Sequence, residues 1–250
     1  MKSILGIGSL LFVLGGCSFL GDASMGDEGE VQFRLYGVGC GFGCDLSEPV
    51  AVGSQSDIGL NSELLDEALS VRVPDSVIAS YRESFTCFPA SEESPNEVRS
   101  VAADEPCAAG EKRTAAREMA VTPSRAEPFV VEVLRAGEVF DRITVDARAV
   151  AGFVTFDDAL DEEVEAISIA PGESRSLRMK IVDEDGDRLA FSHFGGRWAV
   201  DDESIAVMDD DDLNEHLMVM TGVEIGRTTL RLLRNDDTEI ASIDVEVKEP

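Results

Sequence analysis

The sequence predicts an all-β protein in which antiparallel sheets pack face to face in two successive modules. Apolar and polar residues alternate over several stretches after residue 30, which is the period of a strand with one buried face. The length of 250 residues suits two ordinary domains. A hydrophobic fraction of 44% is normal for a chain that fills its cores. We therefore expect two folded modules after a short leader.

Residues 1–16 have the pattern of a secretory signal peptide. Met1-Lys2 gives a positive start, and an uncharged, mostly apolar run follows from Ile4 to Gly16. This run is too short to cross a hydrocarbon core, which takes about 20 helical residues. We therefore expect the leader to be cleaved rather than retained as a membrane span.

The leader ends in Leu14-Gly15-Gly16-Cys17, which resembles the lipobox of bacterial lipoproteins. The resemblance implies cleavage before Cys17 and attachment of a diacylglyceride and an N-acyl chain such as palmitate, so that the first partner is the lipid bilayer. Several acyl chains hold a protein firmly, whereas one chain is marginal. By analogy with enteric lipoproteins, Ser18 favours the outer membrane. The alternative is an ordinary signal peptide cut nearby, which leaves Cys17 as a thiol.

Three segments follow the leader. Residues 17–30 are rich in Gly, Ser and Asp and predict a flexible tether after Cys17. Residues 31–149 are expected to form the first module, and residues 150–250 the second.

Alternation is the evidence for strands in both modules. One face of the expected strands is formed by Val31, Phe33 and Leu35, by Val131, Val133 and Val139, by Leu177, Met179 and Ile181, and by Ala241, Ile243, Val245 and Val247. One segment, Asn61 to Leu69, has helical character, and Asn61 or Ser62 is its expected cap.

Four cysteines remain after Cys17: Cys40, Cys44, Cys87 and Cys107. An even remainder in an exported chain predicts disulfides, and three pairings are possible. The glycines between Cys40 and Cys44 allow a sharp curl, so we favour pairing Cys40 with Cys44 and Cys87 with Cys107. A zinc site is disfavoured because the spacings do not match paired C-x2-C motifs.

The two halves share a pattern, which indicates tandem modules. The first half has Gly53-Ser54, then Ser76 to Ala79, then Asp141 to Val145. In the second half, the equivalent segments are Gly172-Glu173, Ser204 to Val207 and Ser242 to Val247. The first half is longer after its second segment, where Cys87 and Cys107 lie. We expect an inserted, disulfide-closed loop there, and its residues 88–106 are the expected partner-contacting feature.

The second half resembles bacterial immunoglobulin-like domains of group 2. The resemblance covers about residues 165 to 247 and rests on Pro171-Gly172-Glu173, Leu177 to Val182, Asp185-Gly186, Trp198 to Asp201, Ser204 to Val207, Thr221-Gly222 and Gly226 to Leu230. It implies a β-sandwich found in envelope and surface proteins, with Trp198 on a central strand and packed between the sheets. The first half matches more weakly and has no tryptophan. The expected fold is thus two tandem immunoglobulin-like antiparallel β-sandwiches after a cleaved lipoprotein signal peptide.

Charge and motif content narrow the function. Twenty-one basic and 50 acidic residues give a net charge of −29, which excludes binding to nucleic acid or to anionic lipid through basic patches. The two histidines, His193 and His216, lie in no catalytic pattern, and no G-x-S-x-G, H-E-x-x-H or Walker motif occurs. We therefore expect a non-catalytic protein without a cofactor.

One acidic segment is a candidate cation site. Asp183, Asp185 and Asp187 flank a glycine bend, and calcium prefers clustered carboxylate oxygens. The Asp185-Gly186 pair is also a common hairpin signal, so a plain turn between two strands is the favoured interpretation.

The sequence therefore predicts a lipid-anchored structural or binding module of the bacterial envelope, whose partner is an unknown envelope protein or glycan. One alternative is a calcium-dependent adhesin or assembly subunit. Another is an accessory envelope enzyme, which requires a pair of buried carboxylates in a cleft.

Overall fold

The computed structural model describes residues 23–36, 46–62, 68–89, 99–102, 105–157, 162–209 and 217–249. Within these ranges the regular structure is β-strand, as the alternation predicts. No helix in these ranges has the length and apolar character needed to cross a membrane. The leader, Cys17, Cys40, Cys44 and His216 lie outside the described residues.

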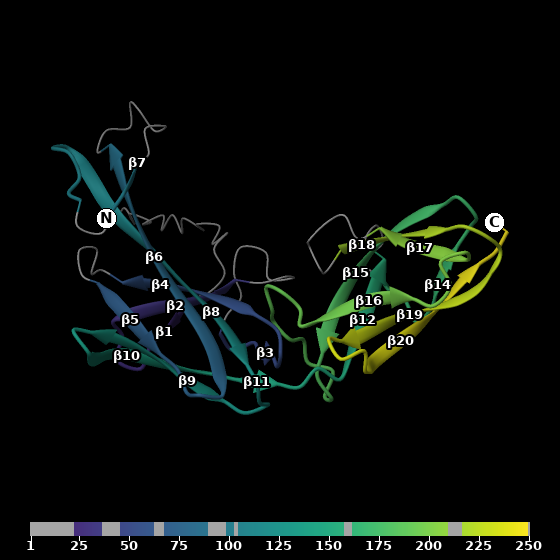
Figure 1. Cartoon of the computed structure of the whole chain (residues 1–250), viewed down its shortest axis with the longest axis horizontal. Coiled ribbons are helices and arrows are strands. Elements are labelled where there is room, and N and C mark those ends of the chain that lie inside the picture. Colours follow the sequence, from purple (N-terminus) through teal and green to yellow (C-terminus); the bar gives the residue numbers. More distant parts are fainter. Residues whose placement is uncertain are drawn as a thin grey trace, which may run out of the picture.

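The first half of the chain forms two facing sheets (Figure 1). Its strands are β1 (Ser24–Met25), β2 (Val31–Tyr36), β3 (Val50–Ala51), β4 (Ser56–Ser62), β5 (Leu69–Arg72), β6 (Val77–Pro89), β7 (Arg99–Val101), β8 (Glu111–Pro123), β9 (Phe129–Arg135), β10 (Glu138–Val145) and β11 (Ala147–Arg148). One sheet has the order β1-β2-β4-β8-β6-β7, the other β10-β9-β5, and β3 pairs with β11 in parallel.

The second half repeats this plan. Its strands are β12 (Gly152–Asp157), β13 (Glu162–Glu163), β14 (Ile167–Ile169), β15 (Ser174–Val182), β16 (Gly196–Val200), β17 (Ala206–Asp209), β18 (Leu217–Gly222), β19 (Gly226–Arg234) and β20 (Glu239–Val247). The sheet orders are β13-β12-β15-β18-β17 and β14-β20-β19-β16, and β14 lies parallel to β20.

The strand orders are those of the immunoglobulin fold, in which one sheet is ordered A-B-E-D and the other G-F-C. Strands A to G correspond to β2, β4, β5, β6, β8, β9 and β10 in the first half and to β12, β15, β16, β17, β18, β19 and β20 in the second. In the second half the short strand β14 pairs in parallel with G, and in the first half the short strand β3 pairs in parallel with β11, which follows G in the chain. The chain therefore contains two tandem immunoglobulin-like sandwiches, called the first and second sandwich below.

The apolar faces expected from alternation form the cores, except that Val139 is 44% exposed, because a β-bulge shifts the register between Val139 and Asp141. Val31, Phe33 and Leu35 are fully buried in the first sandwich, and Leu177 and Val245 in the second. The internal repeat also has a geometric basis, because a glycine with φ of +77° stands before strand B in each sandwich: Gly53 and Gly172. Residues with a Cβ atom rarely adopt this positive φ, which explains why glycine recurs at this position.

Residues 23–30 of the expected flexible tether are folded, because Ser24–Met25 forms β1, which pairs with β2, and Gly26 N donates to Val31 O at 2.9 Å.

The expected helix and the expected position of Trp198 also need correction. Asn61 and Ser62 are strand residues, because they pair with Gln32 and Val31 of β2, and Leu69 begins β5. Residues 63–67 of the expected helix lie outside the described residues. Trp198 does pack between the sheets, edge-on to Phe153 with ring centroids 4.9 Å apart. Its strand β16, however, is at the edge of its sheet rather than at the centre, because it pairs only with β19.

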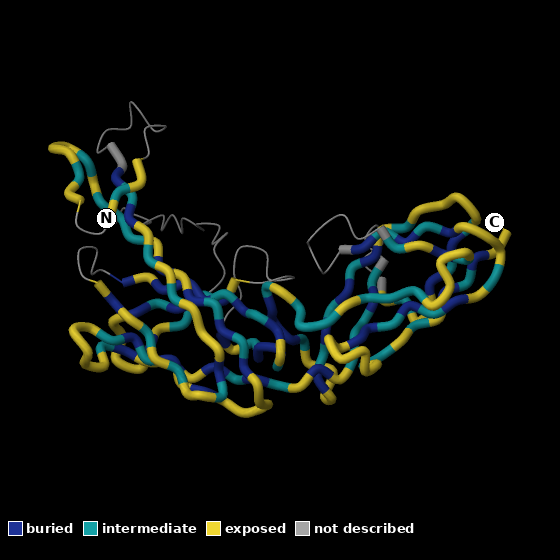
Figure 2. The backbone as a smooth tube through the Cα atoms, in the orientation of Figure 1, coloured by how far each residue is buried: buried dark blue, intermediate teal, exposed yellow. Residues whose placement is uncertain are grey.

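The inserted segment of the first sandwich is a long β-ribbon. Strands β6 and β8 each have 13 residues, against 4 in β17 and 6 in β18, and pair along their whole length. The ribbon extends beyond the body of the first sandwich (Figure 1), and much of its length is exposed (Figure 2). Cys87 and Cys107 form a disulfide at its outer part, which is the pairing that the sequence favours.

Opening this disulfide is expected to loosen the ribbon without unfolding the sandwich below it. Cross-linking a loop of about 20 residues stabilises a fold by about 3 kcal/mol in the chain-entropy model. For the double variant C87S/C107S we expect faster amide exchange in the outer halves of β6 and β8, with unchanged protection of Val31 to Leu35. Equal protection of the ribbon in both proteins would contradict this prediction.

Candidate functional site: the joint between the sandwiches

The two sandwiches meet through a loop of the second that lies on the first. This loop joins β15 to β16 and pairs its backbone with the residues before β4. Ala190 accepts from Ala51 N (3.0 Å) and donates to Pro49 O (2.9 Å), and His193 O accepts from Gln55 N (2.9 Å). The connection at Asp146 to Ala151 is therefore not the sole contact between the sandwiches.

Serine hydroxyl groups form further hydrogen bonds across this joint. The Ser192 hydroxyl accepts from Asp57 N and donates to Tyr36 O, each at 2.9 Å. Ser54 Oγ accepts from Gly195 N at 3.0 Å. Ser56 Oγ donates to Ala190 O at 3.2 Å. Because buried polar groups are costly without partners, these bonds favour one relative position of the two sandwiches.

Apolar contacts also cross the joint. Ala190 of the second sandwich is fully buried in the core of the first. In the opposite direction, Ala51 joins a cluster with Leu189, Phe191 and Leu232 of the second. The cores are therefore connected through packed side chains.

The acidic segment predicted from sequence lies beside this joint and forms a tight turn. Asp183 N donates to Asp187 O (2.9 Å), and Gly186 has a φ of +83°. Asp183 Oδ1 accepts from the backbone N–H groups of Asp185 (3.0 Å) and Asp187 (2.9 Å). The favoured interpretation, a turn between strands, thus describes its backbone.

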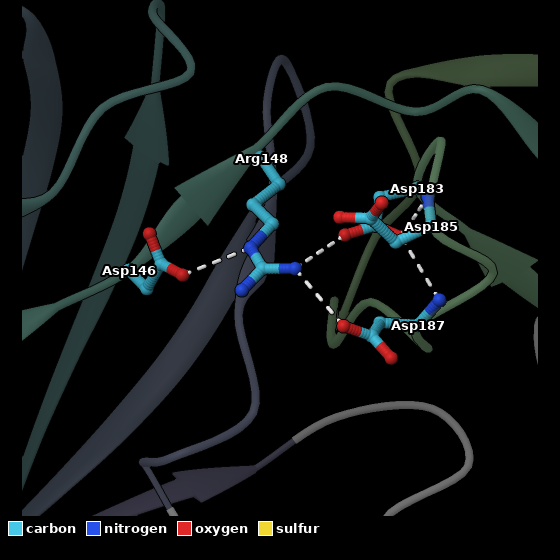
Figure 3. Close-up of polar contacts among 5 residues, drawn as sticks. All are labelled: Asp146, Arg148, Asp183, Asp185 and Asp187. Atoms are coloured by element: carbon cyan, nitrogen blue, oxygen red, sulfur yellow. Dashed lines mark hydrogen bonds and ion pairs between the residues drawn. The ribbon is translucent and has the colours of Figure 1, made fainter.

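The guanidinium of Arg148 lies against the acidic turn. Its Nη1 is 2.6 Å from Asp183 Oδ2 and 3.1 Å from Asp187 Oδ2, and its Nε is 2.9 Å from Asp146 Oδ2 (Figure 3). The bond from Arg148, and then the two backbone N–H groups, hold the pKa of Asp183 below its ordinary value, and the carboxylates raise the pKa of Arg148. Arg148 belongs to β11 at the end of the first sandwich, so this ion pair also spans the joint.

The guanidinium of Arg148 contacts two carboxylates of the candidate calcium site. One carboxylate oxygen each of Asp183, Asp185 and Asp187 can come within 4.8 Å of the others, but Asp183 and Asp187 already pair with the guanidinium. An arginine supplies the positive charge that a metal would otherwise supply, and its N–H groups hydrogen-bond the oxygens that would coordinate the metal. This arrangement counts against a calcium-dependent fold.

The variant R148Q tests this interpretation. For the wild-type protein we expect equal, small rises in the midpoint of thermal unfolding with millimolar calcium and with matched magnesium, because only charge screening acts. For R148Q we expect a lower midpoint without divalent cation and a rise that is larger with calcium, because the carboxylates are left unpaired. The control R197Q removes an exposed guanidinium that pairs with Asp237 at 2.7 Å. A calcium-specific rise in the wild type would contradict the prediction.

Sequence reasoning missed the arginines that organise the structure. Arg117 is 2% exposed and bonds Glu83 Oε1 (2.5 Å) and Ser62 Oγ (3.2 Å), which ties β8 to both neighbouring strands. Arg148 and Arg117 have no motif around them. The one hint in the sequence is that basic residues are scarce. With 21 basic and 50 acidic residues, each arginine readily finds a carboxylate partner.

The enzyme alternative requires two buried carboxylates in one cleft. Among the described residues the buried carboxylates are Asp141 and Asp183, which belong to different sandwiches. Each accepts bonds from backbone N–H groups. His193 lies at the joint with its backbone paired to Gln55. These groups do not form the acid and base that the alternative needs.

Comparisons with known proteins give only remote structural likenesses. No family model matches the chain, and no curated protein matches it. Among solved structures, the Escherichia coli adhesin FdeC has 10% identity and a TM-score of 0.31, covering 91% of this chain and 66% of that one. Domains 4 and 5 of the S-layer protein SbsC have 20% identity and a TM-score of 0.28, covering 52% and 69%. These scores are too low to indicate a shared function, and the immunoglobulin-like topology follows from the strand order alone.

Proposed function

We propose that this protein is a non-catalytic, lipid-anchored module of the bacterial envelope that holds two immunoglobulin-like sandwiches in a fixed relation to each other. The joint is the observation that carries the proposal, because backbone pairing, shared apolar packing and the Arg148 ion pairs all span it. A joint of this kind suits a protein that presents a binding surface at a set position. Sandwich folds serve many functions, so the role is argued from the joint and the leader.

The acylated Cys17 is the membrane anchor, and the outer membrane is the cellular location. The Leu14 to Cys17 sequence supports lipidation, and Ser18 supports outer-membrane sorting. Two or more acyl chains would keep the protein bound despite the repulsion between its net charge of −29 and anionic headgroups.

Metabolic labelling of cells with an alkyne fatty acid tests the anchor. We expect the full chain to incorporate the label and to fractionate with the outer membrane. C17A should lose the label and keep residues 1–16 or leave the membrane fraction, whereas the control C107A should be labelled normally. S18D should shift the protein to the inner membrane. An unlabelled wild-type chain would refute the proposal.

A further inference from the structure

The outer sheet face of the first sandwich is mainly polar, although Ile78 and Tyr36 are exposed on it, and it spans strands β2, β4, β8 and β6. It is the side of the A-B-E-D sheet opposite the core. The residues that define this outer face are Arg34, Tyr36, Asp57, Gly59, Glu118 and Arg82. Because strand order and register are known, their neighbours across the sheet follow directly.

One transverse row of this face carries charges of both signs. Arg34 is opposite Gly59, Gly59 is opposite Glu118, and Glu118 is opposite Arg82. A Cβ atom on Gly59 would lie 2.3 Å from the Tyr36 ring, so the ring lies across β4 at the position where a side chain is missing. Tyr36 is 38% exposed and forms an aromatic platform on the face.

A hollow of about 440 Å³ adjoins this row and reaches the joint. Its lining includes Gln55, Asp57, Ser80, Glu118 and Arg82 of the first sandwich and His193 of the second. Gln55 Nε2 donates to Asp57 Oδ1 at 3.0 Å, and Asp57 N is held by Ser192. The joint therefore orders one wall of the hollow.

Two charged groups of the hollow, Arg82 and Glu118, have no polar side-chain partner among the described residues, although they are opposite in register. The Nε of Arg34 is buried and likewise has no partner among the described residues. By contrast, Arg72, Arg142 and Arg231 all pair with carboxylates.

The chemistry of this face selects among ligand classes. A chain of net charge −29 repels polyanions, and two arginines disfavour a cation. Protein interfaces centre on large apolar anchors, whereas the hollow is lined mainly by polar groups. A hydroxyl group both donates and accepts hydrogen bonds. The hydroxyls of a neutral sugar can therefore accept from the arginines and donate to the carboxylates.

We propose that the outer face of the first sandwich binds a neutral oligosaccharide, with Arg82, Glu118, Asp57 and His193 bonding its hydroxyls and the Tyr36 ring contacting the apolar side of a sugar. The proposal rests on the function proposed above and names the ligand class of that binding module. The site spans the joint, so a fixed relation of the two sandwiches is needed for its full lining.

Titration calorimetry of the full chain in detergent tests the proposal with neutral hexasaccharides based on glucose, mannose and N-acetylglucosamine. We expect at least one to bind, with affinity reduced at least tenfold in R82Q and in E118Q. The control R227Q removes an exposed guanidinium from β19 of the second sandwich and should bind normally. On binding, amide exchange should slow at residues 80–82 and 118–120.

Three outcomes would overturn the proposal. The first is that none of the neutral sugars binds. The second is that an oligogalacturonate or a polyglutamate peptide of equal length binds as tightly as the best neutral sugar. The third is that R82Q and R227Q have equal affinity. Thermal unfolding of each variant shows whether a loss reflects unfolding. Failure here leaves the anchor proposal untouched, since fatty-acid labelling measures that separately.

Discussion

Replacing Asp141 with alanine is expected to lower the free energy of unfolding by about 3 kcal/mol, because unsatisfied buried donors cost about 1–3 kcal/mol each. Asp141 is fully buried on β10. Its Oδ2 accepts from Glu30 N (2.8 Å) and Val31 N (2.7 Å), and its Oδ1 accepts from Glu28 N (2.9 Å). One carboxylate therefore joins the turn at Glu28 and Glu30, which the sequence assigned to a flexible tether, to the opposite sheet.

Chemical denaturation measures this effect. D141N should also be destabilised, because its amide N–H groups would face backbone donors that need an acceptor. The control D75N changes an exposed aspartate. G26A should weaken the same turn, since a Cβ there would lie 2.3 Å from Asp141 Oδ1. Asp141 is not a fastening residue if D141A and D75N are equally stable.

Replacing Gly195 with alanine is expected to open the joint while both sandwiches stay folded. A Cβ atom there would lie 1.8 Å from Gly53 O and 2.7 Å from Gly53 C, both backbone atoms that cannot turn aside. The loop must therefore move away from the first sandwich, and its bonds to Ser54 and Gln55 are lost. The two sandwiches then keep the connection at Asp146 to Ala151, together with the backbone bonds of Ala190 and the Arg148 ion pairs.

Small-angle X-ray scattering checks this prediction. We expect a larger radius of gyration and a broader distribution of distances between spin labels at the exposed positions 138 and 224. Trp198 fluorescence should change as well, because Trp198 packs against the cluster of Ala51, Leu189 and Phe191 that crosses the joint. The control G152A places a Cβ no closer than 3.9 Å to Val182, which is an ordinary contact. Identical scattering from G195A and the wild type would show that the joint is not held by this loop.

Much of the fold could be predicted from local chemistry. Alternation gave the buried faces of β2, β15 and β20, because a strand with one wet face has period two. The glycines before strand B, the longer region between strands D and E, and the Cys87–Cys107 pair were also visible. The short helix after Asn61 was wrong at Asn61, Ser62 and Leu69, since pairing with β2 and β9 outweighs local helical propensity.

By itself, the sequence determined the all-β class and the repeat of two sandwiches, because both follow from the spacing of residues along the chain, and it favoured the disulfide in the ribbon among three possible pairings. Tertiary structure alone decided the joint, the pairing of Arg148 with the acidic turn, the Asp141 fastening and the row from Arg34 to Arg82. Each of these joins residues that are far apart in sequence, and charge or burial at one position does not specify a distant partner. The partner is set by strand register and by how the two cores pack, which no local pattern encodes.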